Sequence, residues 1–288
     1  MDTILVSQLR KSYGPVRAVD GLSFRVGPGE VYGLLGPNGA GKTTTVETLI
    51  GLRNRDGGEV KVLGLDPEHQ SRELKTRIGV QLQASSLYPR LTVRETVRLF
   101  ANFYPKPLPA DEVIALVGLK EKAKVQTRSL SGGQLQRLAA ALALIGDGEI
   151  IFLDEPTTGL DPQARRGLWD LIQDLKHRGK TVFLTTHYMD EAERLCDRVA
   201  VVDHGQIIAE GPPRVLIEAY FRERAVEFVK PKSFSGEQLT KLPGVQRVQE
   251  EDERTTLYTT EASQTVAALL TQVAANGTSL EDAGGKAG

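Results

Sequence analysis

The sequence has little of several features that would place it in a special class of protein. It carries one cysteine, Cys196, among its 288 residues, which excludes an internal disulfide and a zinc site built from several thiolates. Its longest clearly apolar stretch runs only from Leu138 to Ile145, whereas a helix that crosses a bilayer needs roughly 20 such residues. The first residues lack the basic start and apolar core of a secretion signal. These absences predict a soluble cytoplasmic protein.

An excess of charge of one sign is also missing, because 36 basic residues are matched by 37 acidic ones. A near-neutral chain is not expected to bind nucleic acid through a broad basic surface, although a local patch stays possible. The composition is otherwise ordinary, with 40% hydrophobic and 25% charged residues, which excludes collagen-like, disordered and low-complexity chains. The length predicts about two domains.

Strand-like and helix-like segments alternate over the first two-thirds of the chain. The apolar runs Val31 to Leu35, Ile150 to Leu153 and Val182 to Leu184 are typical of buried strands, and helical stretches separate them. This alternation predicts an α/β fold in which helices cover both faces of a mainly parallel sheet. Asp66-Pro67 and Asp161-Pro162 each offer a capping residue followed by proline, which predicts a helix start at both places.

The composition changes near Tyr220, which predicts a first domain over residues 1–220 and a small α+β domain over 221–288. The strands expected in the second domain are Ala225 to Val229, Val245 to Gln249 and Thr256 to Thr260, and its helices are Glu237 to Leu242 and Ala262 to Ala275.

A phosphate-binding loop is predicted where the run Val31 to Leu35 ends. Residues Gly36 to Thr43 (GPNGAGKT) fit the pattern G-x-x-x-x-G-K-[ST] at every fixed position, and a helical stretch follows. Small residues let the backbone wrap a phosphate with its N–H groups pointing inward. Lys42 would hold the β- and γ-phosphates, and the Thr43 hydroxyl would ligate Mg²⁺.

A second functional site, made of two acidic residues, is predicted at Asp154 and Glu155, directly after the buried strand Ile150 to Leu153. Parallel strands end at the sheet edge where ligands bind in doubly wound folds. Asp154 can hold Mg²⁺, whereas Glu155 points differently and can polarise a water molecule. Because a phosphate loop is present in the same chain, a role in metal binding and catalysis explains these two acids better than capping of the next turn.

Another helix start that favours anions lies about twenty residues before that strand. Ser131 is a good N-cap, and Gln134 completes a Ser-x-x-Gln capping box. Gly132 and Gly133 leave the first N–H groups of the helix uncovered, so the helix dipole favours a negative charge there.

These motifs, in this order, make the chain resemble the nucleotide-binding subunit of ATP-binding-cassette (ABC) transporters. The resemblance covers roughly Ile4 to Ile217 and includes every motif of that family. The residues that match its motifs are Tyr13, Gly36, Pro37, Asn38, Gly39, Ala40, Gly41, Lys42, Thr43, Thr44, Gln83, Ser131, Gly132, Gly133, Gln134, Asp154, Glu155, Asp161 and His187.

The resemblance implies a site for ATP and Mg²⁺. Tyr13 would stack on adenine, and the phosphate loop with its Lys42 would bind the phosphates. Thr43, Gln83 and Asp154 would hold Mg²⁺. Lys42 and Gln83 would also take part in catalysis.

For the reaction itself, the resemblance implies that Glu155 is the catalytic glutamate and that His187 senses the γ-phosphate. It implies further that two ATPase subunits, identical or different, pack head to tail. Ser131 and Gly133 of one subunit would then close the ATP site of the other, and Asp161 would contact the partner.

The fold implied by the resemblance has a RecA-like parallel-sheet core, an N-terminal antiparallel β-subdomain and a helical subdomain over about residues 84–146. That helical subdomain would lie against a separate membrane subunit, with the ATPase at the cytoplasmic face of the membrane. Met189 to Glu193 and the extra C-terminal domain resemble the drug- and lipid-exporter branch, whose members often carry the sequence of Ser279 to Asp282 near the end.

Two other kinds of ABC protein are alternatives. An ABC ATPase that acts on nucleic acid or ribosomes usually has paired cassettes or a long coiled coil, and this sequence shows one cassette and no sustained heptads. A regulatory cassette without activity would need a damaged site, yet Lys42, Asp154, Glu155 and His187 are all present. Export of a drug, lipid or similar substrate is therefore the favoured prediction.

Overall fold

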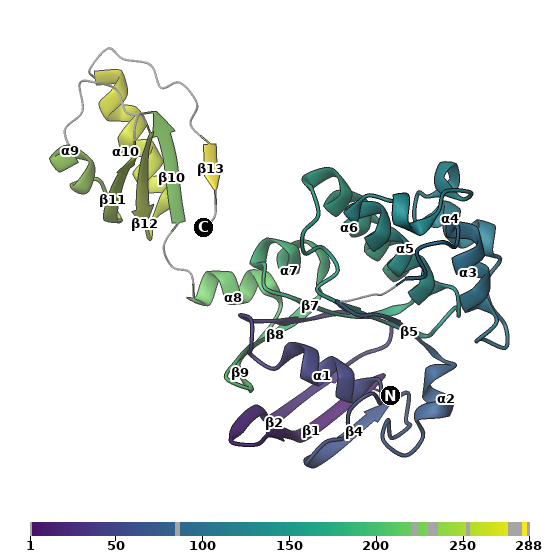
Figure 1. Cartoon of the computed structure of the whole chain (residues 1–288). Helices are drawn as coiled ribbons and strands as arrows, with labels where there is room; N and C mark the ends of the chain where they lie inside the picture. Colours follow the sequence, from purple (N-terminus) through teal and green to yellow (C-terminus); the bar gives the residue numbers. More distant parts are fainter. Residues whose placement is uncertain are drawn as a thin grey trace. The chain divides into compact units, whose positions relative to one another are not determined.

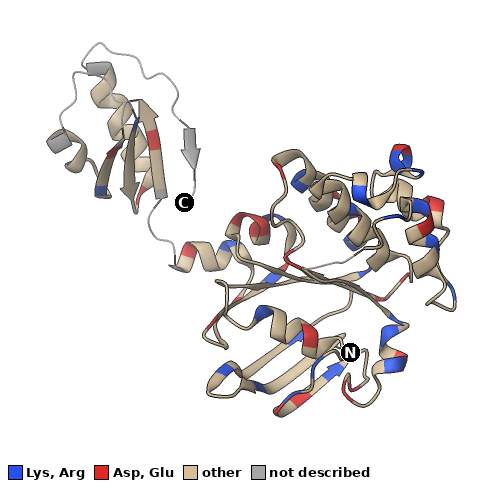
Figure 2. Ribbon diagram, viewed as in Figure 1, with Lys and Arg blue, Asp and Glu red and all other residues tan. Residues whose placement is uncertain are grey.

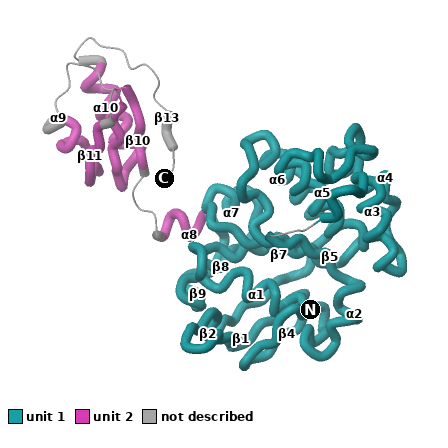
Figure 3. The backbone as a smooth tube through the Cα atoms, in the orientation of Figure 1, with its two compact units in different colours: residues 1–213 teal, residues 214–288 magenta. Residues whose placement is uncertain are grey.

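The chain forms two compact units in the computed structural model, Met1–Pro213 and Arg214–Gly288 (Figure 3). The structure describes residues 2–83, 87–220, 224–229, 236–251, 254–275 and 284–286. The segment Ser279 to Asp282, which resembles the exporter branch, lies outside the described residues. The unit boundary and the division predicted after residue 220 lie at opposite ends of helix α8 (Pro213–Tyr220).

A six-stranded sheet forms the centre of the first unit, in the order β5-β6-β7-β3-β8-β9. Its strands are β3 (Val31–Leu35), β5 (Ile78–Gln81), β6 (Ile150–Asp154), β7 (Thr181–Thr186), β8 (Arg198–Asp203) and β9 (Gln206–Gly211). All neighbours pair in parallel except β8 and β9, which form an antiparallel hairpin. The central strands β3, β6 and β7 are buried throughout, because the layers of the fold cover both faces of the sheet.

A smaller antiparallel sheet and helix α1 cover one face of this central sheet (Figure 1). The smaller sheet has the order β2-β1-β4, with β1 (Ile4–Tyr13), β2 (Val16–Val26) and β4 (Gly57–Val62). Helix α1 spans Lys42–Leu49. One apolar core joins all three, and it contains the stacked rings of Phe24, Tyr32 and Phe183. This arrangement confirms the predicted RecA-like core and N-terminal antiparallel β-subdomain.

Helices cover the other face of the sheet and extend beyond it (Figure 1). Helix α5 packs on β5 and β6, α6 on β7, and α7 on β3 and β7. Helices α3 and α4 pack on one another and on α5. The bounds of these helices are α3 (Val93–Ala101), α4 (Ala110–Leu116), η1 (Lys120–Lys122), η2 (Thr127–Ser129), α5 (Gly132–Leu144), α6 (Pro162–His177) and α7 (Met189–Leu195). Helix α2 (Ser71–Lys75) lies on the side of the smaller sheet (Figure 1).

Local capping signals account for where several of these helices begin. Thr92 and Glu95 form a complete capping box at the start of α3, and Ser131 and Gln134 form another at α5. Asp161 caps α6 ahead of Pro162, as predicted.

The matching prediction at Asp66-Pro67 is wrong, because α2 begins only at Ser71. The Asp66 carboxylate accepts from the backbone N–H of Glu68 at 3.0 Å, and it also forms a two-pronged ion pair with Arg55, at 2.9 and 2.7 Å. The capping contact is therefore present, and Gln70 N donates to the Asp66 carbonyl oxygen to close a single turn, but regular helix begins only at Ser71.

The second unit has a β-α-β-β-α-β arrangement with its own apolar core. Its antiparallel sheet has the strand order β11-β12-β10-β13, which is the ferredoxin-like order. The elements are β10 (Arg224–Val229), α9 (Gly236–Thr240), β11 (Val245–Glu251), β12 (Arg254–Thr259), α10 (Ala262–Ala275) and β13 (Gly284–Lys286). This bears out an α+β character for the C-terminal part.

Basic and acidic residues are interspersed along the described elements of both units (Figure 2). Across the part of the chain that the structure describes, no helix has both the length and the apolar character that crossing a membrane requires.

Candidate ATP site

The phosphate loop lies between β3 and α1 at the carboxyl edge of the central sheet. Gly41 has a φ of 101° at the N-cap of α1, a conformation that L side chains avoid. A Cβ atom on Gly36 would lie 2.2 Å from the Val202 carbonyl oxygen, and one on Gly41 would lie 2.2 Å from that of Ala18. Glycine at both positions therefore lets the loop fold tightly against its neighbours.

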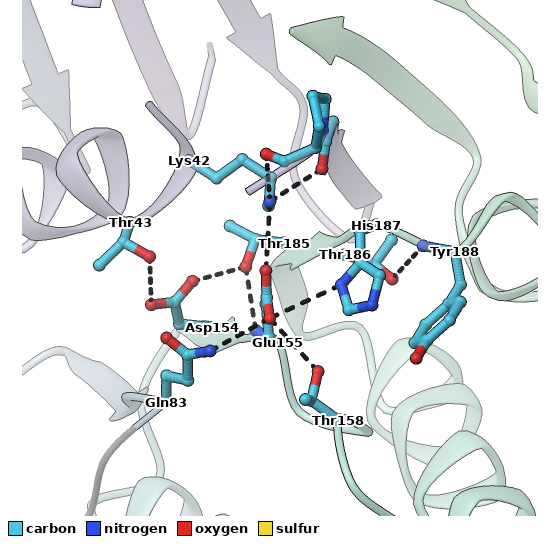
Figure 4. A network of polar contacts seen from close by, with 12 residues as sticks. Lys42, Thr43, Gln83, Asp154, Glu155, Thr158, Thr185, Thr186, His187 and Tyr188 are labelled. Carbon is cyan, nitrogen blue, oxygen red and sulfur yellow. Dashed lines mark hydrogen bonds and ion pairs between the residues drawn. The ribbon is translucent and has the colours of Figure 1, made fainter. Parts of the chain in front are cut away.

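Lys42 is buried within this loop. Its Nζ donates to the carbonyl oxygens of Gly36 and Pro37 at 2.8 and 3.0 Å. The same atom lies 3.1 Å from Oε1 of Glu155. Figure 4 shows Glu155 between Lys42, Gln83, Thr158 and His187. The predicted loop and the predicted acidic pair thus meet at one point.

Asp154 is held by two hydroxyl groups. Thr43 Oγ1 donates to one carboxylate oxygen at 3.0 Å, and Thr185 Oγ1 donates to the other at 2.6 Å (Figure 4). Burial raises the pKa of Asp154 above its ordinary value, and the hydrogen bonds from Thr185 and Thr43 lower it in part. The pairing register of β6 with β7 places Thr185 opposite Asp154.

These oxygen donors fit Mg²⁺, which binds proteins through one or two carboxylates together with substrate phosphates. Thr43 and Asp154 supply a hydroxyl and a carboxylate side by side at the mouth of the phosphate loop. Within the described residues, no group of three or more His, Cys, Asp or Glu side chains could hold a metal by itself. An ion here would take its remaining ligands from water and from the bound nucleotide.

The other predicted catalytic residues, Gln83 and His187, lie beside the Glu155 carboxylate. Gln83 Nε2 donates to its Oε2 at 3.2 Å, and Thr158 Oγ1 donates to the same atom at 3.3 Å. His187 Nδ1 lies 3.6 Å away, too far for a hydrogen bond. Glu155 adopts a φ of 47°, which is rare for a residue with a side chain and marks stored strain. Its backbone N–H donates to Thr185 Oγ1 at 2.9 Å.

A cavity of about 440 Å³ opens over the loop. Its lining includes Asn38, Lys42 and Thr43 from the loop region, with Gln83 and Glu155 from the opposite side. Such a volume suits a nucleotide phosphate tail with its metal. Of the predicted site residues, this cavity brings part of the phosphate loop together with Gln83 and Glu155, whereas Asp154 and His187 are not part of its lining.

Tyr13 stands apart from this lining at the end of β1, and 40% of its surface is exposed. The Arg53 guanidinium lies 5.1 Å from its ring centroid, and Glu47 holds Arg53 through a 2.6 Å hydrogen bond. That hydrogen bond raises the pKa of Arg53. A cation on an aromatic ring steadies it by a cation–π interaction, so Arg53 helps to fix the predicted adenine platform.

The predicted signature turn, Ser131 to Gln134, also lies outside the lining of that cavity. Ser131 Oγ accepts from Gln134 N at 3.3 Å, and Gln134 Oε1 accepts from Ser131 N at 3.1 Å. Gly133 lies against Ala164 of α6, where an added Cβ would be 3.0 Å from the alanine methyl. Ser131 and Gly132 are exposed.

Asp161 is exposed as well, and its Oδ1 caps α6 by accepting from the backbone N–H groups of Gln163 and Ala164. Its predicted contact with a partner subunit is compatible with this position but stays a prediction.

His69, His177 and His204 are exposed, and Cys196 is a buried free thiol whose pKa burial raises strongly.

Sequence reasoning missed Thr185, which joins Asp154 to the backbone of Glu155. The only signal for it is its place at the end of an apolar strand, two residues before His187. It also missed Thr158, because a contact between a turn residue and Glu155 depends on how the chain folds back after β6.

Comparison with known proteins identifies the family. The ABC transporter family model matches residues 19–158. The Nod factor export ATP-binding protein I of Burkholderia pseudomallei is 46% identical over 231 residues, which cover 78% of this chain and 75% of the relative. The chain belongs to the ABC transporter family. A relative of the same name from Rhizobium sp. is 41% identical over 267 residues, covering 89% of this chain and 86% of the relative.

Solved structures of ABC cassettes share the fold of this ABC subunit. One is cbiO1 from Clostridium perfringens, part of a transporter complex, with 27% identity and a TM-score of 0.68 over 77% of this chain and 93% of the other. Another is the dimeric cassette MJ0796 in a post-hydrolysis state with ADP and Pi, with 28% identity and a TM-score of 0.67 over 73% and 99%. The chain is thus an ATP-binding subunit and an ATPase.

Proposed function

We propose that the groups around Glu155 hydrolyse ATP bound on the phosphate loop. Thr43 and Asp154 would hold Mg²⁺ with Gln83 nearby, and the ion would neutralise charge that develops on the phosphates. Glu155 would accept a proton from the attacking water, and His187 would donate a hydrogen bond to the γ-phosphate. The single observation that carries this proposal is the convergence of Lys42, Gln83 and His187 on one buried carboxylate.

Lys42 has to serve two partners in this scheme. Its two hydrogen bonds to loop carbonyls hold the ammonium group at the loop, whichever anion it faces. A γ-phosphate would take the place of Glu155 beside Nζ, which frees the carboxylate to face the water.

We propose further that each ATP is enclosed by two ATPase subunits packed head to tail. The signature turn offers exposed N–H groups at a helix start, which favour an anion, yet it does not line the phosphate cavity of its own chain. A second subunit, identical or different, would bring its Ser131 and Gly133 to the phosphates, with Asp161 at the contact. The dimeric relative bound to ADP and Pi supports this arrangement.

A groove between the central sheet and the helical layer is the proposed dock for a membrane subunit. It has a volume of about 530 Å³ and an apolar floor that includes Ile78 and Val80. Phe103 and Leu52 are 70% and 53% exposed at its sides, and Arg72 and Lys75 add positive charge. The matching partner is a short cytoplasmic segment of a permease with an apolar side chain flanked by acidic ones.

Export is the direction we propose, because the relatives are named export ATP-binding proteins. The membrane subunit would select the cargo, and the ATPase would lie at the cytoplasmic face, where ATP is available. Co-expression with a permease encoded nearby, followed by co-purification and an ATPase assay in vesicles, tests this function. Stimulation by the permease is expected, whereas stimulation by RNA alone would contradict it.

A further inference from the structure

Two neighbouring threonines at the end of β7 serve opposite faces of the sheet. Consecutive side chains of a strand point in opposite directions. Thr185 contacts Asp154 and Glu155 in the ATP site. The next residue, Thr186, instead donates from Oγ1 to Oε2 of Glu191 at 2.6 Å, on the side of helix α7.

The Thr186 hydroxyl also accepts a hydrogen bond from the backbone N–H of Tyr188 at 3.0 Å (Figure 4). Thr186 and Tyr188 are the residues on either side of His187. One hydroxyl group therefore closes the turn that presents the imidazole to Glu155.

Glu191 is only 1% exposed, so the position of its carboxylate is set by its partners. Oε1 accepts from Nε1 of Trp169 on α6 at 3.1 Å, and Oε2 accepts from Thr186. The Arg194 guanidinium lies 4.9 Å from the Trp169 ring centroid. A buried carboxylate without hydrogen bonds is costly, so these two bonds hold Glu191 in one place.

His187 itself has little to fix its ring. Within the described residues, its buried Nδ1 has no hydrogen-bond partner, and its ring packs against Tyr188 with centroids 4.0 Å apart. The direction of the imidazole therefore depends on the backbone turn, which the Thr186 hydroxyl closes, and on the Tyr188 ring, which the Arg165 guanidinium faces at 5.1 Å.

We propose that Glu191, anchored by Trp169, is a positioning residue that acts through Thr186 to aim His187 at the γ-phosphate. This inference rests on the role proposed for His187 in ATP hydrolysis. None of the three side chains needs to touch the nucleotide, since their contribution is the placement of the turn from Thr186 to Tyr188.

Three substitutions in the full-length chain each change one of these side chains. Thr186→Val keeps the shape and deletes the hydroxyl, Glu191→Gln replaces one acceptor oxygen, and Trp169→Phe keeps the ring and deletes the N–H donor. Thr186→Ser, which restores the hydroxyl, and Asp190→Asn, at an exposed neighbour on α7, are the matched controls.

We expect kcat for ATP hydrolysis to fall between about tenfold and a hundredfold in Thr186→Val, as for a catalytic group displaced by about 1 Å. Glu191→Gln and Trp169→Phe should show smaller losses of the same kind. ATP affinity should be unchanged in all three, and both controls should behave like the wild type. A Thr186→Val protein that keeps its full kcat would overturn the inference.

The NMR signals of the His187 imidazole separate positioning from general damage. They can be assigned by difference, because the chain has four histidines and His187→Ala removes one set. Shifted or broadened His187 signals in Thr186→Val, with the other three sets unchanged, support the inference. Unchanged His187 signals together with a lower kcat would refute it.

The His187→Ala protein distinguishes this inference from the proposed function beneath it. If His187→Ala hydrolyses ATP normally, the role proposed for His187 fails. If His187→Ala is inactive while Thr186→Val, Glu191→Gln and Trp169→Phe are fully active, the role of His187 stands and only the positioning inference fails. The positioning inference is supported if Thr186→Val lowers kcat in the wild-type chain but causes no further loss in the His187→Ala chain, because the effects of coupled residues are not additive.

Discussion

Lys42 and Glu155 form a buried ion pair, in which Nζ lies 3.1 Å from Oε1 and the two side chains are 4% and 7% exposed. The pair joins the phosphate loop to the end of β6, two segments more than a hundred positions apart along the chain. A γ-phosphate bound beside Lys42 would take the place of Glu155 in this ion pair.

Removing Lys42 alone should destabilise the fold as well as the activity. Lys42→Ala leaves Glu155 buried without its cation, and loss of one partner of a buried pair costs about 3 kcal/mol. Urea unfolding followed by the fluorescence of Trp169, the sole tryptophan and part of the first unit, measures this cost. The double variant Lys42→Ala with Glu155→Gln should recover part of the lost free energy of unfolding. If the two single changes in unfolding free energy simply added up in the double variant, the ion pair would contribute nothing.

Glu155→Gln should bind ATP but hardly hydrolyse it. The amide keeps the size of the side chain and can still accept from Gln83, but it cannot take a proton from water. Light scattering should then detect ATP-dependent dimers that persist, because the step that separates them is lost. Glu121→Gln, at an exposed residue of η1, is the control. A Glu155→Gln protein that turns over like the wild type would contradict the assignment.

Asp154→Asn should stabilise the fold while it abolishes activity. A carboxyl group whose pKa is raised on folding favours the folded state most below its unfolded pKa of 3.8, and that contribution is lost as the pH rises through the folded pKa. Asparagine carries no such penalty and can keep both threonine contacts. Without nucleotide, the variant should therefore unfold at higher urea than the wild type at pH 7. This difference should shrink as the pH falls toward 3.8, and a variant less stable at pH 7 would contradict the expectation.

Thr185→Val should weaken the apparent affinity of the ATPase for Mg²⁺. The change removes a hydrogen bond to Asp154 and leaves the buried N–H of Glu155 without its acceptor, at a cost of roughly 1–3 kcal/mol. More Mg²⁺ should be needed for half-maximal activity, because loss of that bond raises the pKa of Asp154 further. Thr185→Ser should restore the wild-type titration. Equal magnesium titrations for the wild type and Thr185→Val would show that Thr185 is not needed.

The parts of the site that depend on neighbouring residues could be predicted from the sequence. The phosphate loop, the capping boxes at Thr92 and Ser131, and the acidic pair after β6 are each contained within a few consecutive residues, so their chemistry and spacing are visible together. The Asp161-Pro162 helix start is of the same kind.

The contacts that depend on strand register or on distant partners could not be predicted. Thr185 reaches Asp154 only because β6 and β7 pair in one particular register, and Trp169 meets Glu191 only because α6 and α7 pack together. At Asp66 the local capping contact to Glu68 is present, whereas the ion pair with Arg55 is a contact of the kind that the sequence does not reveal.

The central claim is that the signature turn of one subunit completes the ATP site of another, and mixing two inactive variants tests it most directly. Lys42→Ala disables the phosphate loop and leaves the residues of the signature turn unchanged. Gly132→Asp places a negative charge at the signature turn, where an added Cβ atom meets nothing within 4 Å, and Gly132→Ala is its uncharged control. A mixed dimer contains one site with an intact loop and an intact partner turn, so ATPase activity should reappear on mixing. If the mixture stays as inactive as its two components while Gly132→Ala is active, the shared-site account is wrong.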